Sequence, residues 1–343
     1  MPMTVVPHGW IILDKPLGLG STQAVAAVKR NLREAGYGRK VKVGHGGTLD
    51  PLATGVLPIA LGEATKLAGR MLDASKVYAF TVQFGSETDT LDLEGKVIAE
   101  CEVRPTQAQV AAVLVQFTGL IEQVPPAYSA LMVNGRRAYD LARAGETVEL
   151  KSRHVTIYSL EPLSGSGRGT AAGGGGSLEQ NATLRPDESP LQAATGRSPR
   201  TGEELADVTL VAHVSKGTYI RSLARDIAHA LGTCGHVTML RRLKAGPFAE
   251  TAAISLDNLN EVGKGAPLEN VLLPLEAGLV DIPALDLGPE QARAVRQGRV
   301  LTGLPQDDGL WLARSGMVPV ALVELSGGSL SVVRGFNLSD VAE

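Results

Sequence analysis

Residues 44–55 read GHGGTLDPLATG, and this stretch combines features that decide how its backbone is held. Three glycines near its start permit sharp backbone geometry. Pro51 pushes the residue before it, Asp50, toward an extended conformation, so we expect this carboxylate on a rigid loop. A fixed carboxylate suits a nucleophile or a base. The local sequence also allows an alternative, in which Asp50 caps a helix that begins near Pro51.

The composition indicates a globular chain, and its 343 residues suffice for one large domain and a small one. No segment reaches the roughly 18 uninterrupted apolar residues of a membrane span, and we expect a cytoplasmic protein. Cys101 and Cys234 form no C-x-x-C pair, so we expect two small core residues and neither a disulfide nor a zinc site. The glycine motifs typical of ATP and NAD binding are also missing.

The net charge of −3 conceals an asymmetry along the chain. Residues 1–160 and 206–250 together carry 23 basic and 18 acidic groups, whereas residues 251–343 carry 6 and 12. Clustered basic side chains predict phosphate contacts, with solvated helix and hairpin faces as the alternative. The clusters are Lys29, Arg30, Arg33, Arg39, Lys40 and Lys42; Arg136, Arg137, Arg143, Lys151 and Arg153; and Arg221, Arg225, Arg241, Arg242 and Lys244.

Hydrophobic periodicity predicts a mixture of helices and strands. Residues 21–36 have helical spacing with a Ser or Thr cap, and residues 106–119 and 218–232 also read as helices. Strands are expected at 76–85 and on both sides of residues 164–204, a Gly-rich stretch that we interpret as a disordered insertion at a hairpin tip. From about residue 277, short apolar runs between Gly, Pro and Asp predict a small all-β module.

Five blocks resemble the bacterial TruB family of tRNA pseudouridine-55 synthases. They occur in the family's order within residues 9–160 and 206–250, and the tail resembles the family's PUA domain. The resemblance implies an α+β catalytic domain, residues 1–276, with a central, largely antiparallel mixed sheet flanked by helices. A β-barrel, PUA-like RNA-binding domain would follow at 277–343. The blocks are LDKPLG, GHGGTLDPLATGVLPIALGEATK, VPPAYSALMVNGRRAYDLARAGETVE, SKGTYIRSLARDIAHALG and HVTMLRRLKAGPF.

The reaction implied by the resemblance is the isomerisation of a uridine in the T loop of tRNA, with no metal and no cofactor. Asp50 matches the catalytic aspartate, as nucleophile or base, and Arg221 matches the arginine that pairs with it. The target base must be flipped out of the RNA and held. Tyr78 matches the stacking tyrosine, and Tyr219 and Leu240 match residues that line the uracil pocket.

Further residues receive secondary roles from the same resemblance. His45 matches a histidine that contacts the flipped region, with a structural histidine as the alternative. Lys15, with Pro16, is expected to pack under the loop that holds Asp50, and Asp92 is a polar candidate behind the site. A mobile thumb at about 125–153 would bring three arginines to the RNA: Arg136, Arg137 and Arg143.

The expected partner is tRNA, contacted at its T loop and acceptor arm, by a monomer that needs no membrane and no obligate protein partner. Two alternatives stay open. The chain could be a guide-RNA-dependent pseudouridine synthase relative, or a tRNA-binding folding helper whose catalysis is incidental.

Overall fold

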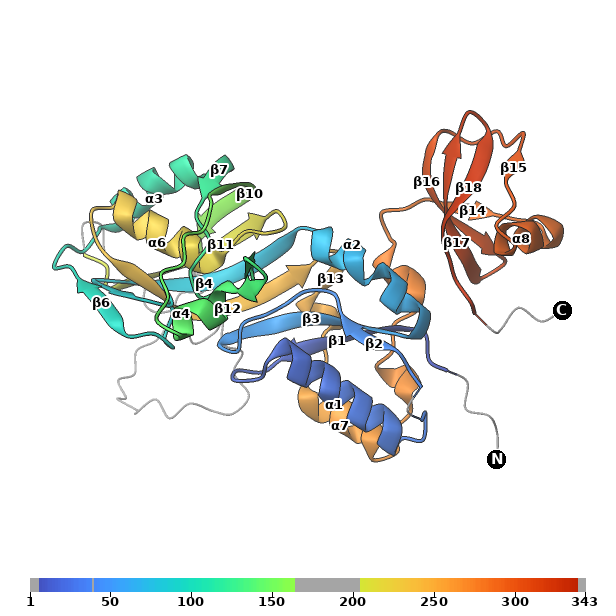
Figure 1. The fold of residues 1–343 in the computed structure, drawn as a ribbon, viewed down its shortest axis with the longest axis horizontal. Coiled ribbons are helices and arrows are strands. Elements are labelled where there is room, and N and C mark those ends of the chain that lie inside the picture. Colours follow the sequence, from blue (N-terminus) through green and yellow to red (C-terminus); the bar gives the residue numbers. More distant parts are fainter. Residues whose placement is uncertain (1–5, 39, 164–203, 339–343) are drawn as a thin grey trace, which may run out of the picture. The chain divides into compact units, whose positions relative to one another are not determined.

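The computed structural model describes residues 6–38, 40–163 and 204–338, and the chain divides into two compact units (Figure 1). Unit 1 comprises residues 1–74 and 242–343, and unit 2 comprises residues 75–241. The predicted α+β class, with a largely antiparallel sheet flanked by helices and a small β module at the C-terminus, is confirmed. The domain boundary between residues 276 and 277 stays a prediction.

The first part of unit 1 is built on an antiparallel pair of strands, β1 and β3, with β2 paired to β3. Strand β1 has the sequence GWIILDK, and its apolar side chains are almost fully buried. Trp10 packs its ring against Phe248 and donates from Nε1 to the Leu275 carbonyl at 3.0 Å. The bounds are β1 (Gly9–Lys15), β2 (Val43–His45) and β3 (Ala53–Leu61).

Helix α1 (Ser21–Glu34) confirms the helix predicted from residue 21, but the predicted cap is wrong. The N-cap is Gly20, whose N–H donates to Gln23 Oε1 at 2.7 Å. The Ser21 hydroxyl instead bonds the backbone of Leu49. The helix packs against α7, where Asn31 donates to Asn260 at 3.1 Å. The other elements of this part are η1 (Gly62–Leu67), α2 (Ala68–Asp73), β13 (Phe248–Ala249), η3 (Glu250–Ala252), α7 (Leu256–Gly263), η4 (Leu268–Asn270) and η5 (Leu275–Gly278).

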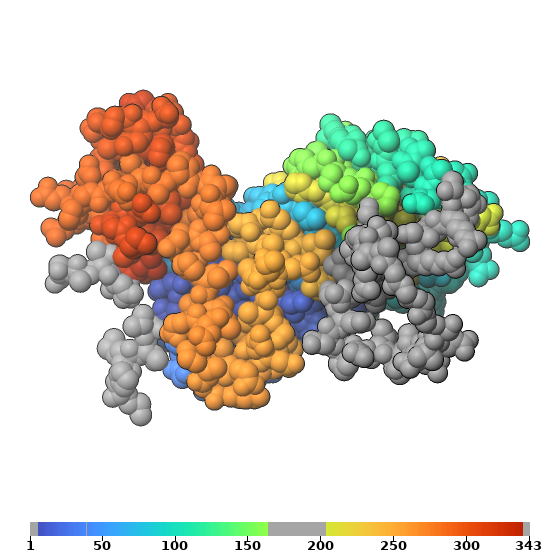
Figure 2. All heavy atoms as spheres, turned by 180° about the vertical axis from the view of Figure 1, so that it is seen from behind, coloured from blue at the N-terminus to red at the C-terminus, as the bar shows by residue number. Residues whose placement is uncertain are grey.

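The C-terminal part of unit 1 is a curled five-stranded sheet in the order β14-β16-β17-β18-β15. Helix α8 buries Ala292 and Val295 against it, in a core of its own. In the space-filling view this segment forms one closely packed mass, coloured from orange to red (Figure 2). The bounds are β14 (Ala284–Asp286), α8 (Pro289–Arg296), β15 (Leu301–Thr302), β16 (Gly309–Ser315), β17 (Val318–Ser326) and β18 (Ser329–Gly335).

Unit 2 is built on the antiparallel strand order β4-β11-β10-β7. Helices α3 and α6 bury apolar side chains in one core with these strands (Figure 1). The bounds are β4 (Lys76–Phe84), β5 (Ser86–Thr88), β6 (Val97–Glu100), α3 (Gln107–Leu114), η2 (Val115–Phe117), β7 (Gly119–Gln123), β8 (Met132–Val133), β9 (Arg136–Arg137), α4 (Ala138–Arg143), β10 (Arg153–Pro162), β11 (Asp207–Val214) and α6 (Ile220–Ala230). Strand β12 (Gly235–Ala245) begins in unit 2 and ends in unit 1.

The strands on either side of the predicted insertion, β10 and β11, pair as antiparallel neighbours, which confirms the expected hairpin. Residues 164–204 were predicted to be a disordered insertion. Of these, residues 164–203 lie outside the described residues, and only Glu204 is described. Glu204 forms a backbone bridge with Thr106, just before α3. The end of the segment is therefore fixed against unit 2.

The two cysteines were expected to be unpaired, and this expectation is wrong. Cys101 and Cys234 form a disulfide with a Cα–Cα distance of 5.7 Å, across 133 residues of sequence. Both approach the same glycine, because Gly85 donates to the Cys234 carbonyl and accepts from the Cys101 N–H. The spacing of the two cysteines in the sequence carries no sign of this bond. Their proximity comes from the fold, in which both bond to the backbone of Gly85.

Candidate active site

Asp50 lies in unit 1 on a tight connection between β2 and β3. Residues 51–52 form a turn, the Ala53 N–H donates to the Asp50 carbonyl at 3.0 Å, and β3 begins at once. The alternative in which Asp50 caps a helix is therefore wrong, because the chain continues into a strand. The Gly18 N–H also donates to the Pro51 carbonyl at 2.9 Å, which ties this turn to the segment after β1.

Two glycines of the loop are required by close approaches of the backbone. A Cβ atom on Gly55 would lie 2.3 Å from the Arg242 carbonyl oxygen, and Gly55 has a φ of +96°. A Cβ atom on Gly46 would lie 2.6 Å from Met71 Cβ. No real Cβ contact is this short, and only glycine adopts such a φ at little cost. The loop around Asp50 is thus packed without room for side chains at these positions.

Lys15 contacts the turn that follows Asp50. Its side chain is fully buried, and Nζ donates to the carbonyls of Leu19 (2.6 Å), Pro16 (3.1 Å) and Pro51 (3.2 Å). Burial lowers its pKa to about 8, an effect that the charge of Asp50 opposes and that of Arg242 assists. An ammonium group is therefore held near Asp50 and joins two chain segments through their carbonyls.

Arg242, on strand β12, contacts this loop, although no sequence pattern marked it as a site residue. The basic cluster that includes Arg242 predicts phosphate contacts. Its side chain is only 1% exposed, so it is not available for such a contact. Its Nε donates to the Val56 carbonyl at 2.7 Å, and Nη1 donates to the Thr48 carbonyl at 3.3 Å. It therefore bonds the backbone on both sides of Asp50. The local sequence offered one signal, an adjacent Arg–Arg pair inside a strand-like run, and both of its members are buried.

His45 lies at the end of β2 and is half-buried. Burial, followed by the positive charge of Arg242, lowers its pKa, and a hydrogen bond to the backbone of Gly47 partly opposes this. The neutral imidazole is therefore favoured. A neutral ring can lie against an RNA base or take a structural bond, so both interpretations of His45 stay open.

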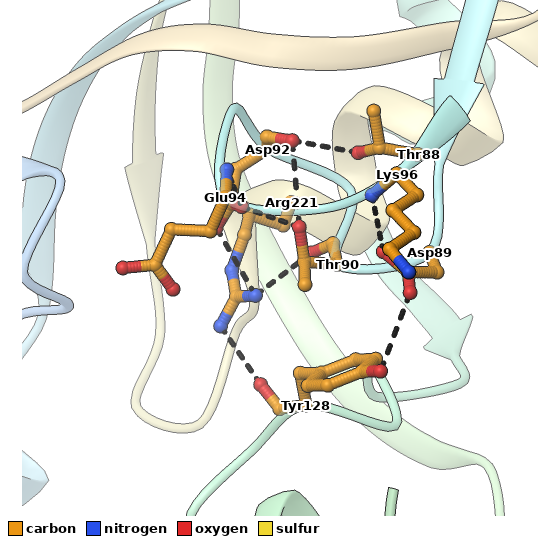
Figure 3. Close-up of polar contacts among 8 residues, drawn as sticks. All are labelled: Thr88, Asp89, Thr90, Asp92, Glu94, Lys96, Tyr128 and Arg221. Carbon is orange, nitrogen blue, oxygen red and sulfur yellow. Dashed lines mark hydrogen bonds and ion pairs between the residues drawn. The ribbon is translucent and has the colours of Figure 1, made fainter. Parts of the chain in front are cut away.

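Arg221 lies in unit 2 near the start of α6, and its guanidinium contacts Thr90, Tyr128 and Asp92 (Figure 3). Nη1 donates to the Thr90 carbonyl at 2.8 Å, Nη2 donates to the Tyr128 carbonyl at 3.0 Å, and Nη1 lies 3.3 Å from Asp92 Oδ2. Both charged side chains of the ion pair are less than a tenth exposed. The structure thus brings together two of the predicted residues, Arg221 and Asp92.

The loop after β5 holds Asp92 by its own bonds (Figure 3). Its Oδ1 accepts from the Thr90 hydroxyl at 2.5 Å and from the Glu94 N–H at 3.0 Å. Its carbonyl accepts from the Thr88 hydroxyl at 2.7 Å. Leu91 has a φ of +63°, a conformation that non-glycine residues rarely adopt. The position of this carboxylate is therefore fixed by hydrogen bonds within its own loop, from the Thr90 hydroxyl and the Glu94 N–H.

Three predicted pocket residues lie on different elements of unit 2. Tyr78 is on β4 and Leu240 on β12, and both are half-buried beside the apolar core. Tyr219 precedes α6, and Gln123 bonds its backbone twice: Nε2 donates to the Tyr219 carbonyl (3.1 Å), and Oε1 accepts from its N–H (2.8 Å). No sequence pattern pointed to Gln123, which is 1% exposed.

The predicted thumb carries its three arginines on the surface of unit 2. Arg136 and Arg137 form the short strand β9, and Arg143 ends helix α4. All three are exposed. Arg136 forms an ion pair with Glu146 at 2.8 Å, and the Arg143 guanidinium lies 4.7 Å from the centre of the Tyr139 ring.

The predicted site residues are thus divided between the units. Asp50, His45 and Lys15 belong to unit 1, whereas Arg221, Asp92 and the three pocket residues belong to unit 2. The pairing of Asp50 with Arg221 stays a prediction. Within the described ranges, no group of three or more metal-binding side chains comes together. No described helix is long and apolar enough to cross a membrane.

Comparison with known proteins gives two family matches. Residues 33–172 match the TruB family pseudouridylate synthase N-terminal domain, and residues 221–280 match the tRNA pseudouridylate synthase B C-terminal domain. A tRNA pseudouridine synthase B from Novosphingobium aromaticivorans is 70% identical, with 98% of this chain and 99% of that protein covered. The protein of the same name from Zymomonas mobilis is 53% identical, with 98% and 100% covered.

Among solved structures, a chain of an H/ACA ribonucleoprotein bound to a substrate RNA containing 2′-deoxyuridine has a TM-score of 0.63. Its sequence identity is 24%, and 97% of this chain and 86% of that chain are covered, so the likeness concerns the fold. The class defined by these matches is the pseudouridylate synthases, which are isomerases. Within that class, the chain belongs to the TruB family.

Proposed function

We propose that this chain converts the uridine at position 55, in the T loop of tRNA, to pseudouridine. Family membership and the names of its relatives support the reaction and the substrate. The observation that carries the assignment of the site is the fixation of Asp50. The backbone on both sides of it is held by Arg242, and the turn after it by Lys15. Such a loop keeps a carboxylate in place for a reaction that depends on its position.

The proposed reaction exchanges one bond to the ribose for another. The bond between C1′ and N1 breaks, the uracil turns, and a bond forms between C1′ and C5. The proton on C5 leaves, and N1 gains one, so nothing is consumed. Asp50 acts as a nucleophile at C1′ or as a base at the sugar. In both cases its charge stabilises the positive charge that develops at the ribosyl carbon.

Arg221 supplies a positive charge that pairs with Asp50 when the site is assembled. A guanidinium can bond a carboxylate through two N–H groups and so fix its orientation. Asp92 positions Arg221, because its carboxylate lies 3.3 Å from Nη1 within unit 2. Since the ion pair is buried, the loss of either partner would leave an uncompensated charge. Asp92 is therefore a positioning residue.

The substrate is recognised by its shape and its flipped base. Tyr78, Tyr219 and Leu240 hold the uracil by stacking and apolar contact, and His45 contacts the region that the base leaves. The exposed arginines of the thumb bind phosphates, and the C-terminal sheet contacts the acceptor arm. The enzyme works as a monomer in the cytoplasm, without guide RNA, metal or organic cofactor.

The test is the conversion of uridine to pseudouridine in an unmodified tRNA transcript, with no guide RNA and no cofactor. The intact chain should convert the uridine, and Asp50→Asn should bind the tRNA without converting it. Asp257→Asn, which removes an exposed carboxylate from the first turn of α7, is the matched control and should keep full activity. Conversion by Asp50→Asn at the intact rate would contradict the role of Asp50. Binding without conversion by the intact chain would favour the guide-dependent or folding-helper alternative.

A further inference from the structure

Arg153 and Gln123 face each other across the strands β10 and β7, and both contact Tyr219. Gln123 bonds the Tyr219 backbone in both directions, as described above. The Arg153 guanidinium lies over the Tyr219 ring, 4.6 Å from its centre. One register pair thus holds both the backbone and the ring of a single tyrosine. A guanidinium on an aromatic face is attracted by the ring's electrons and also restricts the tilt of the ring.

One edge of the Arg153 guanidinium has no partner among the described residues. The atoms Nε and Nη2 are both buried and make no hydrogen bond there. These two nitrogens lie on the same side of the planar group, and their N–H bonds point in the same direction. This is the edge with which arginine binds two oxygens of one carboxylate or phosphate group.

An unpartnered donor pair of this kind favours an anionic ligand. Buried donors have already lost their water, so an incoming anion does not have to displace it. No described carboxylate forms an ion pair with Arg153. The neighbouring Gly217 is exposed, and a Cβ atom there would lie 3.5 Å from Nη1, so the other end of the guanidinium lies beside an exposed turn.

We propose that Arg153 is both a positioning residue for Tyr219 and the binding site for one phosphodiester group of the substrate RNA. Its face fixes the ring plane of Tyr219, and the N–H groups of Nε and Nη2 donate to the phosphate oxygens. The phosphate then holds the guanidinium in the orientation that covers the ring. Binding of the RNA backbone is thereby coupled to the geometry of the base pocket. This inference rests on the proposed function, because only that function places Tyr219 at the flipped uracil.

The test compares Arg153→Met and Arg153→Lys with the intact chain. The dissociation constant for an unmodified tRNA transcript is measured over a series of salt concentrations. Loss of one phosphate contact should lower the slope of log Kd against log salt by about 0.7 to 1 in Arg153→Met. Binding at one fixed low salt concentration should weaken about tenfold or more. Arg153→Lys keeps a charge for the phosphate and should retain the slope.

The second readout is the single-turnover rate of conversion at saturating tRNA. Both variants should be slower, because neither methionine nor lysine presents a planar group to the Tyr219 ring. Lys264→Met, which removes one exposed charge from the end of α7, is the control for net charge and should keep both the slope and the rate.

Two outcomes would overturn the inference. An unchanged salt slope in Arg153→Met, with a lower melting temperature, would show that Arg153 only stabilises the fold. An intact rate in both variants at saturating tRNA would show that it does not position Tyr219. If the intact chain itself converts no uridine, the proposed function fails instead, and the salt slopes still decide whether Arg153 binds a phosphate.

Discussion

Ser21 and Leu49 exchange two hydrogen bonds, although they are 28 residues apart in the chain. The Leu49 N–H donates to Ser21 Oγ at 2.8 Å, and the Ser21 hydroxyl donates to the Leu49 carbonyl at 3.1 Å. A single side chain thus satisfies both backbone groups of the residue before Asp50. The orientation of the loop is thereby tied to the first residue of α1.

Ser21→Ala should destabilise the chain and slow catalysis. It leaves the backbone N–H of buried Leu49 without a partner, at a cost of about 1–3 kcal/mol. Because Asp50 follows directly, we expect the conversion rate at saturating tRNA to fall about tenfold. The free energy of unfolding in urea and the single-turnover rate measure the two effects. Thr22→Ala, at the exposed next position, should change neither, and equal losses in both variants would contradict the proposed link.

Gly55→Ala should lower the free energy of unfolding by about 2–4 kcal/mol, because the new methyl group meets the Arg242 carbonyl and the φ of +96° is strained. The matched control is Gly69→Ala in α2, where nothing lies within 4 Å of the added carbon. That change should be neutral or slightly stabilising, since alanine favours a helix. Chemical denaturation of both variants is the measurement, and equal stabilities would refute the close approach.

The lowered pKa of Lys15, about 8 against an ordinary 10.5, predicts a dependence of stability on pH. Below pH 8 the group is protonated in both states. Between about pH 8 and 10.5 the unfolded chain binds more protons at Lys15 than the folded chain does. The free energy of unfolding should then rise with pH, by up to about 1.4 kcal/mol per unit from this group.

The measurement for Lys15 is urea denaturation of the intact chain and of Lys15→Met at several pH values from 7 to 10. The difference between the two should shift in favour of the intact chain as the pH rises. Other titrating groups are common to both proteins and cancel in the difference. A difference that does not vary with pH would show that Lys15 titrates normally.

Asp92→Asn should slow conversion about tenfold or more while tRNA binding changes little. Asparagine keeps an oxygen for the Thr90 and Glu94 bonds but removes the charge that faces Arg221. The control is Asp89→Asn in the same loop, whose carboxylate bonds Lys96 N–H and the Tyr128 hydroxyl instead. The measurement is the single-turnover rate at saturating tRNA, which should fall in Asp92→Asn and stay unchanged in Asp89→Asn. Equal rates for Asp92→Asn and the intact chain would show that Asp92 has no role in the mechanism.

Local sequence patterns predicted much of the fold because each depends on neighbouring residues. Helical spacing gave α1 and α6, and alternation gave β10 and β11 on either side of the insertion. The cap of α1 was wrong, because a glycine serves as N-cap while Ser21 bonds a distant loop. Side chains that bond across many residues leave no periodic signal in the sequence.

The site residues were predicted from the resemblance to a family more than from the chemistry of the residues themselves. Two buried residues that support the site were not predicted, and the reason is physical. Arg242 and Gln123 are buried polar groups whose partners are backbone atoms. Polar residue types normally occupy the surface, so their burial depends on tertiary contacts that no local pattern carries. Arg242 was therefore read as a surface cation, although it holds the loop of Asp50 from within.

The disulfide between Cys101 and Cys234 has a consequence for fragments of the chain. It closes a covalent ring through most of unit 2, and residues 164–203 lie inside that ring. A single proteolytic cut anywhere between the two cysteines opens the backbone but leaves both fragments joined. Nicked protein should migrate as one species on a denaturing gel until a reductant separates it. Because cytosolic thiols are usually kept reduced, the same gel reports which form the cell contains if free thiols are blocked at lysis and the chain is then nicked.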